Sequence, residues 1–242
     1  MEAVTRFRAA VIDLDDTLVA FDAVSASSWK TVLDAYAEQH AVDAVTLYET
    51  IMRCNNWYWS DAERHRIGRN DLIAARTKVI RMAFDELHNN DDARALAEIY
   101  TRERTSQMFL YPGAHEMLDA LHGLGMALVL VTNGEAAVQR EKIERFCLAR
   151  HFSHILIEGE KGYGKPDERI YNDALAVAGA SPGATMIVGD NLEWEIAVPR
   201  RLGFFTVWCN HRGQKLPEDA AAKRPDAMIQ SLNELVGVAT GA

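Results

Sequence analysis

Short apolar runs alternate with amphipathic helical segments along most of this chain, and several of the runs end in polar residues. The first run, from Phe7 to Ile12, is interrupted only by Arg8 and is followed by Asp13 and Asp15. Such a run predicts a buried strand that presents carboxylates at its C-terminal end. Similar runs predict four further strands, at residues 126–131, 154–157, 185–188 and 204–208, and residues 225–229 lead to a final helix around residues 232–236.

The region between Ala20 and Phe109 follows a different pattern, because its apolar residues recur at helical spacing. Trp29, Leu33 and Tyr36 show this spacing, and no strand candidate interrupts the region. An inserted helical unit explains the change of pattern most simply. We therefore expect a core domain of residues 1–18 and 110–242 and an all-helical cap domain of residues 19–109.

Strands that alternate with helices predict a parallel sheet, because right-handed crossovers place helices on both of its faces. We expect an α/β fold with a Rossmann-like, five-stranded parallel sheet, to which the helical cap is added. Ligands bind beyond the carboxyl ends of the strands in such sheets. The polar residues that follow the predicted strands belong to this edge: Asp13, Asp15, Thr132, Asn133, Gly134, Lys165 and Asp190.

Asp13 and Asp15 are the first candidates for chemistry. Alternation along an extended strand sends both side chains the same way, so their carboxylates repel each other unless a cation or a shared proton intervenes. A divalent metal ion is the simplest such cation. Helix capping is the structural alternative, although a cap needs only one Asp or Thr and not an Asp-x-Asp pair.

Three later segments offer groups that suit an anion or a metal. Residues 132–134 (Thr-Asn-Gly) end a strand with a hydroxyl and backbone N–H groups. Lys165 stands between a glycine and a proline and can point its ammonium group at carboxylates and phosphate, with a plain surface lysine as the alternative. Asp190 marks a second acidic strand end, and Glu195 follows it on the next helix.

Composition and charge narrow the range of partners. The 242-residue chain has 26 basic and 35 acidic residues, a net charge of −9, which argues against a general affinity for nucleic acid or an anionic membrane. No apolar run reaches the roughly 18 residues that a membrane span needs, and charged residues interrupt the N-terminal run. The three cysteines are widely spaced and indicate reduced thiols. We therefore expect a cytoplasmic monomer or homodimer that acts on a small molecule.

Taken together, the four polar segments resemble the motifs of the haloacid dehalogenase-like (HAD) hydrolase superfamily. The matching residues are Asp13-Leu14-Asp15-Asp16-Thr17, Thr132-Asn133-Gly134, Lys165 in Gly-Lys-Pro-Asp, and Gly189-Asp190-Asn191 with Glu195. The helical insert is similar to the C1-type cap of the subfamily I enzymes phosphoglycolate phosphatase, pyrimidine 5′-nucleotidase and N-acylneuraminate-9-phosphatase. The resemblance implies a phosphatase that hydrolyses a small phosphate monoester, such as a nucleotide, a sugar phosphate or phosphoglycolate.

The resemblance also implies catalytic roles. Asp13 would be the nucleophile that forms an aspartyl-phosphate, and Asp15 would first protonate the leaving alkoxide and then activate water. Lys165 would add positive charge beside the nucleophile and the phosphoryl oxygens. Thr132 and the backbone N–H groups of the segment that includes Asn133 and Gly134 would hold those oxygens in the transition state.

The implied cofactor is Mg²⁺, because a carboxylate approaches an anionic phosphate only when a cation offsets the charge. The resemblance assigns the metal to the Asp13 carboxylate, the Asp15 backbone carbonyl and the Asp190 carboxylate. Glu195 stands where the family more often has Asp, and Trp194 where it often has Asn. The longer Glu195 side chain is expected to reach a metal-bound water.

Three alternatives stay open on the sequence alone. A 2-haloacid dehalogenase of the same fold uses an Asp nucleophile without magnesium and lacks the second aspartate, so Asp15 argues against it. A phosphomutase would keep every core residue named above. A non-catalytic binding protein with this fold would usually have lost Asp13 or Asp15, whose repulsion is unfavourable without a use.

Overall fold

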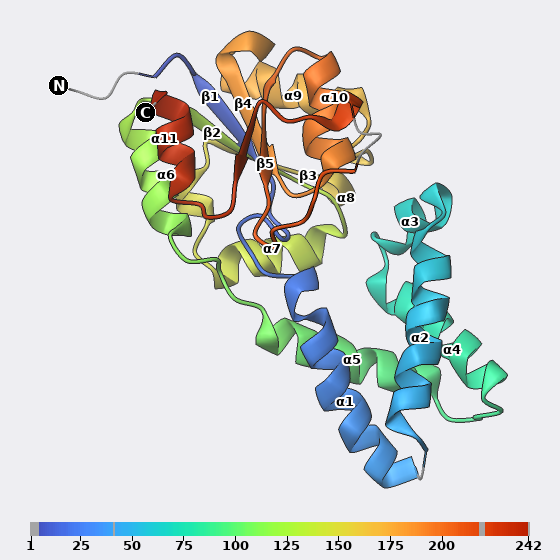
Figure 1. Ribbon diagram of the computed structural model, residues 1–242. Coiled ribbons are helices and arrows are strands. Elements are labelled where there is room, and N and C mark those ends of the chain that lie inside the picture. The colour runs from blue at the N-terminus through green and yellow to red at the C-terminus, as the bar shows by residue number, and fades with distance from the viewer. Residues whose placement is uncertain (1–4, 41, 218–220, 242) are drawn as a thin grey trace. The chain divides into compact units, whose positions relative to one another are not determined.

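The computed structural model describes residues 5–40, 42–217 and 221–241. The chain divides into two compact units, which we call the core unit (up to Ala20 and from Leu110 onward) and the cap unit (Phe21–Phe109). Figure 1 shows that strands belong to the first unit and that the second is built from helices. Residues 1–4, 41, 218–220 and 242, which the expected domain boundaries include, lie outside the described residues.

The described part of the core unit contains one parallel sheet, and its strands follow the order β3-β2-β1-β4-β5-β6. The sheet has six strands and not the five expected, because residues 227–229 form an additional edge strand. That strand has only three residues, and Met228 is exposed, so its apolar pattern is too short to distinguish from a loop. The strands are β1 (Ala9–Ile12), β2 (Ala127–Thr132), β3 (His154–Ile157), β4 (Thr185–Gly189), β5 (Phe205–Cys209) and β6 (Ala227–Ile229).

Helices cover both faces of this sheet, as the alternating pattern predicts. In Figure 1, α6 and α11 lie on one side of the strands and α9 and α10 on the other, and α6 packs against α11 while α9 packs against β2 and β3. A π-helical turn, Leu192–Ala197, precedes α10. The α-helices of the unit are α6 (Ala114–Gly123), α7 (Ala136–Arg145), α8 (Glu158–Lys161), α9 (Glu168–Ala178), α10 (Val198–Arg201) and α11 (Glu234–Thr240).

The register of the sheet brings several strand ends together. Ile12, the last residue of β1, lies opposite Leu130 of β2 on one side and Val188 of β4 on the other. All four residues of β1 are buried, which explains why the strand reads as a continuous apolar run. The chain order reverses at β1, with β2 on one side and β4 on the other. A crevice beyond the carboxyl ends is expected at such a switch point.

Helices joined by turns and short loops make up the described residues of the cap unit, and aspartates start most of these helices. The side chains of Asp43, Asp61, Asp71 and Asp92 each accept a hydrogen bond from a backbone N–H in the first turn of the helix that follows. The elements are a 3₁₀ turn (Asp22–Val24), α1 (Ser25–His40), α2 (Ala44–Trp59), α3 (Ala62–Gly68), α4 (Leu72–Glu86) and α5 (Ala93–Gln107).

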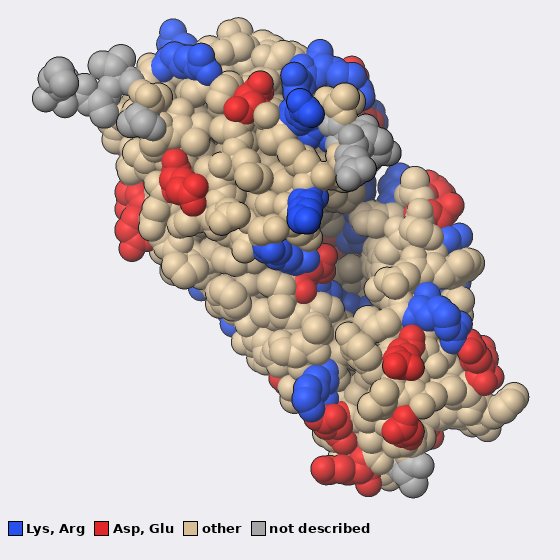
Figure 2. Space-filling view, in the orientation of Figure 1, with Lys and Arg blue, Asp and Glu red and all other residues tan. Residues whose placement is uncertain are grey.

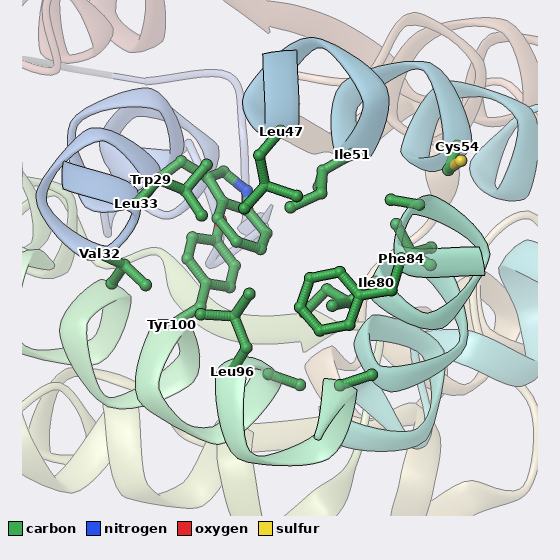
Figure 3. Close-up of a cluster of buried hydrophobic side chains, with 14 of the residues drawn as sticks. Trp29, Val32, Leu33, Leu47, Ile51, Cys54, Ile80, Phe84, Leu96 and Tyr100 are labelled. Atoms are coloured by element: carbon green, nitrogen blue, oxygen red, sulfur yellow. The ribbon is translucent and has the colours of Figure 1, made fainter. Parts of the chain in front are cut away.

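An apolar cluster of its own holds the cap unit together (Figure 3). Trp29 of α1 stacks on Tyr100 of α5, with ring centroids 3.7 Å apart. Phe84 and Ile80 of α4 are fully buried beside them. Burial of such side chains contributes about 1.5–3 kcal/mol each. The apolar residues that recur at helical spacing in the sequence are therefore the residues that form this cluster.

Candidate active site

Asp13 follows the end of β1 and lies in the interior of the core unit. Its backbone N–H donates to the carbonyl of Val188 at 3.0 Å, which continues the pairing with β4. Its carboxylate accepts from the hydroxyl of Thr17 at 3.1 Å and from the ammonium of Lys165 at 2.5 Å. Burial raises the pKa of Asp13, while the charge of Lys165 opposes that rise. Asp13 is thus a buried carboxylate held in one orientation.

Lys165 links Asp13 to Glu195 in a buried group of three charges. Its Nζ lies 2.5 Å from Asp13 Oδ1 and 2.8 Å from Glu195 Oε1, and it donates to the carbonyl of Val131 at 2.9 Å. Burial lowers the pKa of Lys165, but the charges of the two carboxylates outweigh it and raise the pKa overall. Burial raises the pKa of Glu195 to about 7. Lys165 is not a surface lysine, the alternative considered from the sequence, because it is only 1% exposed.

The main chain around Lys165 is fixed by Asn133. The Asn133 side-chain amide donates to the Lys165 carbonyl at 2.6 Å and accepts from the Lys165 N–H at 2.8 Å. Gly164 permits this contact, since a Cβ at that position would lie 2.3 Å from Asn133 Oδ1. Gly189 similarly makes room for Glu195, whose Cγ would be 2.1 Å from an added Cβ. Glycine at these two motif positions therefore allows neighbouring side chains to pack closely.

Asp15 is bound by the helix that follows β2. Lys142 Nζ donates to both Asp15 oxygens, at 2.7 and 2.8 Å, and Gln139 Nε2 donates to Asp15 Oδ2 at 3.0 Å. The same Gln139 amide donates to the hydroxyl of Thr132. Helix α7 therefore contacts both Asp15, which is expected to transfer protons, and Thr132, which is expected to hold phosphoryl oxygens.

Gly134 and Asp190 complete the positions singled out in the sequence. The N–H of Gly134, expected to face a phosphoryl oxygen, donates to Glu158 Oε2 at 2.9 Å. The carbonyl of Asp190 accepts from the indole N–H of Trp208 at 2.8 Å. Burial, and next the charge of Asp13, raise the pKa of the Asp190 carboxyl well above its usual value. Asp190 therefore lies in the electrostatic field of Asp13.

A cleft opens beside Asp190 in the core unit. Asp16 and Tyr111 line it, together with residues 208–212 and Gln214. Asp16 has a left-handed backbone (φ 56°) and pairs with Arg212 at 3.0 Å, while His211 stacks on Tyr111 with centroids 3.7 Å apart. Asp16 does not cap a helix, because it lies in a tight turn closed by its N–H and the carbonyl of Val19, and the next helical element begins only at Asp22.

Sequence reasoning missed Gln139 and Lys142, although both are buried beside Asp15. The two residues are spaced by three positions on a predicted helix, and such polar pairs usually face solvent. A usable signal was their distance along the chain from the Thr132 strand end, since the first turns of the following helix remain close to that edge. Glu158 was also missed, because it follows a strand that carried no motif.

The donors at this edge suit a hard divalent cation. Asp13 and Asp190 offer carboxylate oxygens in a buried setting where one charge already perturbs the other, and backbone carbonyls add further oxygen donors. Within the described ranges, three or more His, Cys, Asp or Glu side chains do not gather into a single metal cluster. An ion at this edge would therefore rest on two carboxylates, backbone oxygen and water, which is the set that Mg²⁺ accepts.

Comparison with known proteins agrees with the fold and the motifs. Residues 7–203 match the haloacid dehalogenase-like hydrolase family. The chain is 34% identical to a phosphoserine phosphatase of Thermus thermophilus, over 93% of this chain and 96% of that protein. It is 27% identical to the pyrimidine 5′-nucleotidase PynA of Streptococcus pneumoniae, over 83% and 82% of the two chains. This protein belongs to the haloacid dehalogenase-like hydrolases.

Solved structures share the same architecture. The putative HAD-hydrolase YfnB of Bacillus subtilis, solved bound to magnesium, superposes with a TM-score of 0.75, covers 96% of this chain and 98% of its own, and is 22% identical. A 2-haloacid dehalogenase of Pseudomonas syringae pv. Tomato has a TM-score of 0.61 and 26% identity, over 96% and 97% of the two chains. The fold is therefore shared by a magnesium-bound HAD-hydrolase and a 2-haloacid dehalogenase, and the site residues must decide between activities.

Proposed function

We propose that this protein is a Mg²⁺-dependent phosphatase that hydrolyses a small phosphate monoester through an aspartyl-phosphate on Asp13. The observation that carries the proposal is the Asp13 carboxylate, buried at the end of β1 with Lys165 at 2.5 Å and Asp15 two residues later. Family membership supports the same class, because the similar Thermus and Streptococcus proteins are named as phosphatase and nucleotidase.

The reaction proceeds in two displacements at phosphorus. In the first, an Asp13 oxygen forms a bond to phosphorus, the ester P–O bond breaks, and Asp15 gives its proton to the departing alkoxide. In the second, water attacks phosphorus, Asp15 takes a proton from that water, and the Asp13–phosphorus bond breaks to release inorganic phosphate. Lys165 balances the carboxylate charge of Asp13, and Thr132 and the N–H of Asn133 hold phosphoryl oxygens.

Magnesium would be held by the Asp13 and Asp190 carboxylates and the Asp15 carbonyl, and it would offset the charge between carboxylate and phosphate. Glu195 has two contacts that the sequence did not predict, because its carboxylate lies 2.8 Å from Lys165 Nζ and accepts from the N–H of Asn191 at 3.0 Å. We propose that Glu195 keeps Lys165 in place beside Asp13, and that any link to metal-bound water is secondary.

A small molecule is the proposed partner, and the cap unit is proposed to act as the cap domain that selects it. Basic and acidic side chains both occur on the visible face of each unit (Figure 2), which fits a net charge of −9 and gives no reason to expect nucleic acid. In the part of the chain that the structure describes, every helix is too short or too polar to traverse a bilayer.

Dehalogenation is the second candidate, and the Pseudomonas dehalogenase structure is the observation in its favour. Asp15 opposes it, because halide needs no proton from an acid on leaving, whereas an alkoxide does. The screen that separates the candidates measures phosphate release, with Mg²⁺ and with EDTA, from phosphoserine, pyrimidine nucleotides, sugar phosphates and phosphoglycolate, and chloride release from 2-chloropropionate. We expect phosphate release that EDTA abolishes.

The covalent step is tested with Asp13→Asn. This change keeps the shape of the side chain and removes the nucleophile, so turnover should fall by at least about a thousandfold. The matched control is Asp34→Asn, at an exposed residue paired with Lys30 on α1, which should keep wild-type turnover. Near-normal turnover in Asp13→Asn would refute the aspartyl-phosphate, and chloride release without phosphate release would establish the dehalogenase.

A further inference from the structure

Lys142, which belongs to none of the sequence motifs, forms an ion pair with Asp15 inside the core unit. Lys142 Nζ is 2.7 Å from Asp15 Oδ1 and 2.8 Å from Asp15 Oδ2. The Lys142 side chain is only 4% exposed, whereas that of Asp15 is 24% exposed. The lysine is therefore buried beneath a carboxylate that reaches the surface of the site.

Gln139 extends this contact to a second site residue. One Nε2 group serves two acceptors, Asp15 Oδ2 at 3.0 Å and the hydroxyl of Thr132. A hydroxyl has one hydrogen and two acceptor positions. Because the Thr132 oxygen accepts from Gln139, its own hydrogen points away from Gln139. That hydrogen is donated to the Asn133 carbonyl over a long 3.4 Å, a weak contact that a phosphoryl oxygen can replace.

The surroundings of Lys142 differ from those of an exposed cation elsewhere on the same helix. Arg140, two residues earlier on α7, pairs with Glu160 at 2.7 Å, and both of these side chains are well exposed. Such exposed pairs contribute about 0–1 kcal/mol. Burying an ammonium group instead carries a desolvation penalty of several kcal/mol, which the partner must offset. The helix therefore keeps one cation in an unfavourable place where it meets Asp15.

We propose that Lys142 and Gln139 are positioning residues that hold Asp15 for proton transfer and, through Gln139, set the Thr132 hydroxyl toward the phosphoryl group. A carboxylate has about four acceptor positions, and α7 engages three of them here. The proton that Asp15 gives to the alkoxide and later takes from water is carried at the remaining position. Lys142 also balances the negative charge of Asp15 once its proton has left.

This inference rests on the proposed function, because it assigns a partner to the residue that transfers the proton. A leaving group that needs a proton is affected by the loss of that partner, and a leaving group that does not need one is spared. The two esters to compare are therefore an alkyl phosphate, such as the preferred substrate, and p-nitrophenyl phosphate. The test requires that the wild-type protein turn over both esters. If the wild-type protein hydrolysed neither ester, the proposed function itself would be rejected.

The first experiment measures kcat and KM of Lys142→Met on both esters. The expected fall in kcat is about tenfold to hundredfold on the alkyl phosphate and less than about threefold on p-nitrophenyl phosphate, with KM within about twofold. Lys142→Arg keeps the cation and should restore part of kcat on the alkyl ester. Arg140→Met removes a cation from the same helix and should match wild type. Equal loss on both esters, or no loss, overturns the proposal.

The second experiment is a double-mutant cycle with Asp15→Asn. If Lys142 acts through Asp15, the double variant turns over the alkyl phosphate no more slowly than Asp15→Asn alone. Additive losses would show that Lys142 acts elsewhere and would overturn the proposal. Should Lys142→Met fail to fold, as thermal unfolding would reveal, Lys142→Gln keeps a hydrogen-bond donor without the charge and enters the same cycle.

Gln139 is tested by Gln139→Leu. The change removes the donor from both Asp15 and Thr132, so kcat should fall on both esters, with the larger fall on the alkyl phosphate. Unchanged kcat on both would exclude Gln139 as a positioning residue and leave Lys142 alone in that role.

Discussion

The carboxyl edge of the core unit's sheet and the centre of the cap unit bury opposite kinds of side chain. Beyond the carboxyl ends of β1 and β4, the core unit buries Asp13, Lys165, Glu195 and Lys142, all less than about a tenth exposed. The cap unit fills its centre with an apolar cluster in which Trp29, Tyr100 and Phe84 are the large members. Buried charges are unfavourable unless paired, whereas buried apolar surface stabilises a fold directly.

The contrast separates residues kept for chemistry from residues kept for stability. Replacing a buried ion pair by apolar residues of the same shape is often neutral or stabilising, so a group of buried charges is weak evidence for stability. At the sheet edge, such a group coincides with the motifs of a hydrolase family. We infer that the core unit gives up stability at this edge for function, while the apolar cluster stabilises the cap unit.

Among the variants that test this contrast, Lys165→Met is expected to have the largest effect, on both stability and turnover. The change leaves Asp13 and Glu195 buried together without their shared cation, and such an unbalanced pair costs about 3–5 kcal/mol of folding free energy. Turnover should fall by about a hundredfold or more, because the charge beside the nucleophile is lost. Urea unfolding and phosphate release measure the two losses.

Lys161→Met serves as the matched control for Lys165→Met. Lys161 is paired with Asp173 at 2.6 Å, and a third of each side chain is exposed. The free energy of unfolding should then change by less than about 1 kcal/mol, and turnover should stay at the wild-type level. Stable and active Lys165→Met would show that the buried charges serve neither purpose.

In the cap unit, Phe84→Ala should cause a loss of stability of about 3–5 kcal/mol, because it opens a cavity in the apolar cluster. Phe84 is fully buried, whereas Ile99 on α5 is 43% exposed, so Ile99→Ala should change stability by less than about 0.5 kcal/mol. Circular dichroism during urea unfolding measures both.

At temperatures where Phe84→Ala stays folded, its phosphate release from p-nitrophenyl phosphate should remain within about threefold of wild type. A larger loss at full folding would mean that the cap cluster contributes to the chemistry.

The sequence was enough to predict the class of fold and the residues at the sheet edge, because both leave local signals. Buried parallel strands read as continuous apolar runs, Asp13 and Asp190 each follow such a run, and Lys165 is marked by its Gly-Lys-Pro-Asp motif. The sixth strand escaped prediction because three residues with an exposed centre, Met228, do not make a pattern. Local signals are therefore reliable for long buried elements and weak for short edge elements.

Contacts between distant segments could not be predicted in the same way. Lys142 and Asp15 are 127 positions apart, and their pairing depends on where α7 lies beside β1. The contact of Glu195 with Lys165 was also not predicted, because Glu195 lies on a π-helical turn. Helical period alone does not reveal such a turn, because its wider winding shifts the direction of every side chain.

His151 of the core unit offers the smallest effect and sharpens the contrast, because it is a buried titratable group outside the site. It faces His115 at 2.8 Å, Asp119 at 3.1 Å and Arg150 at 3.2 Å. Burial lowers the pKa of His151 despite the opposing charge of Asp119.

The folded state thus favours neutral His151. The stability that this histidine contributes is complete above the unfolded pKa of about 6.5. It is lost as the pH falls below that value toward the folded pKa. We expect the free energy of unfolding to decrease between pH 7.5 and 5 on this account, and His151→Gln to reduce that slope in urea titrations. An unchanged slope in His151→Gln would mean that burial of this histidine does not set the pH dependence, and that the site carboxylates do.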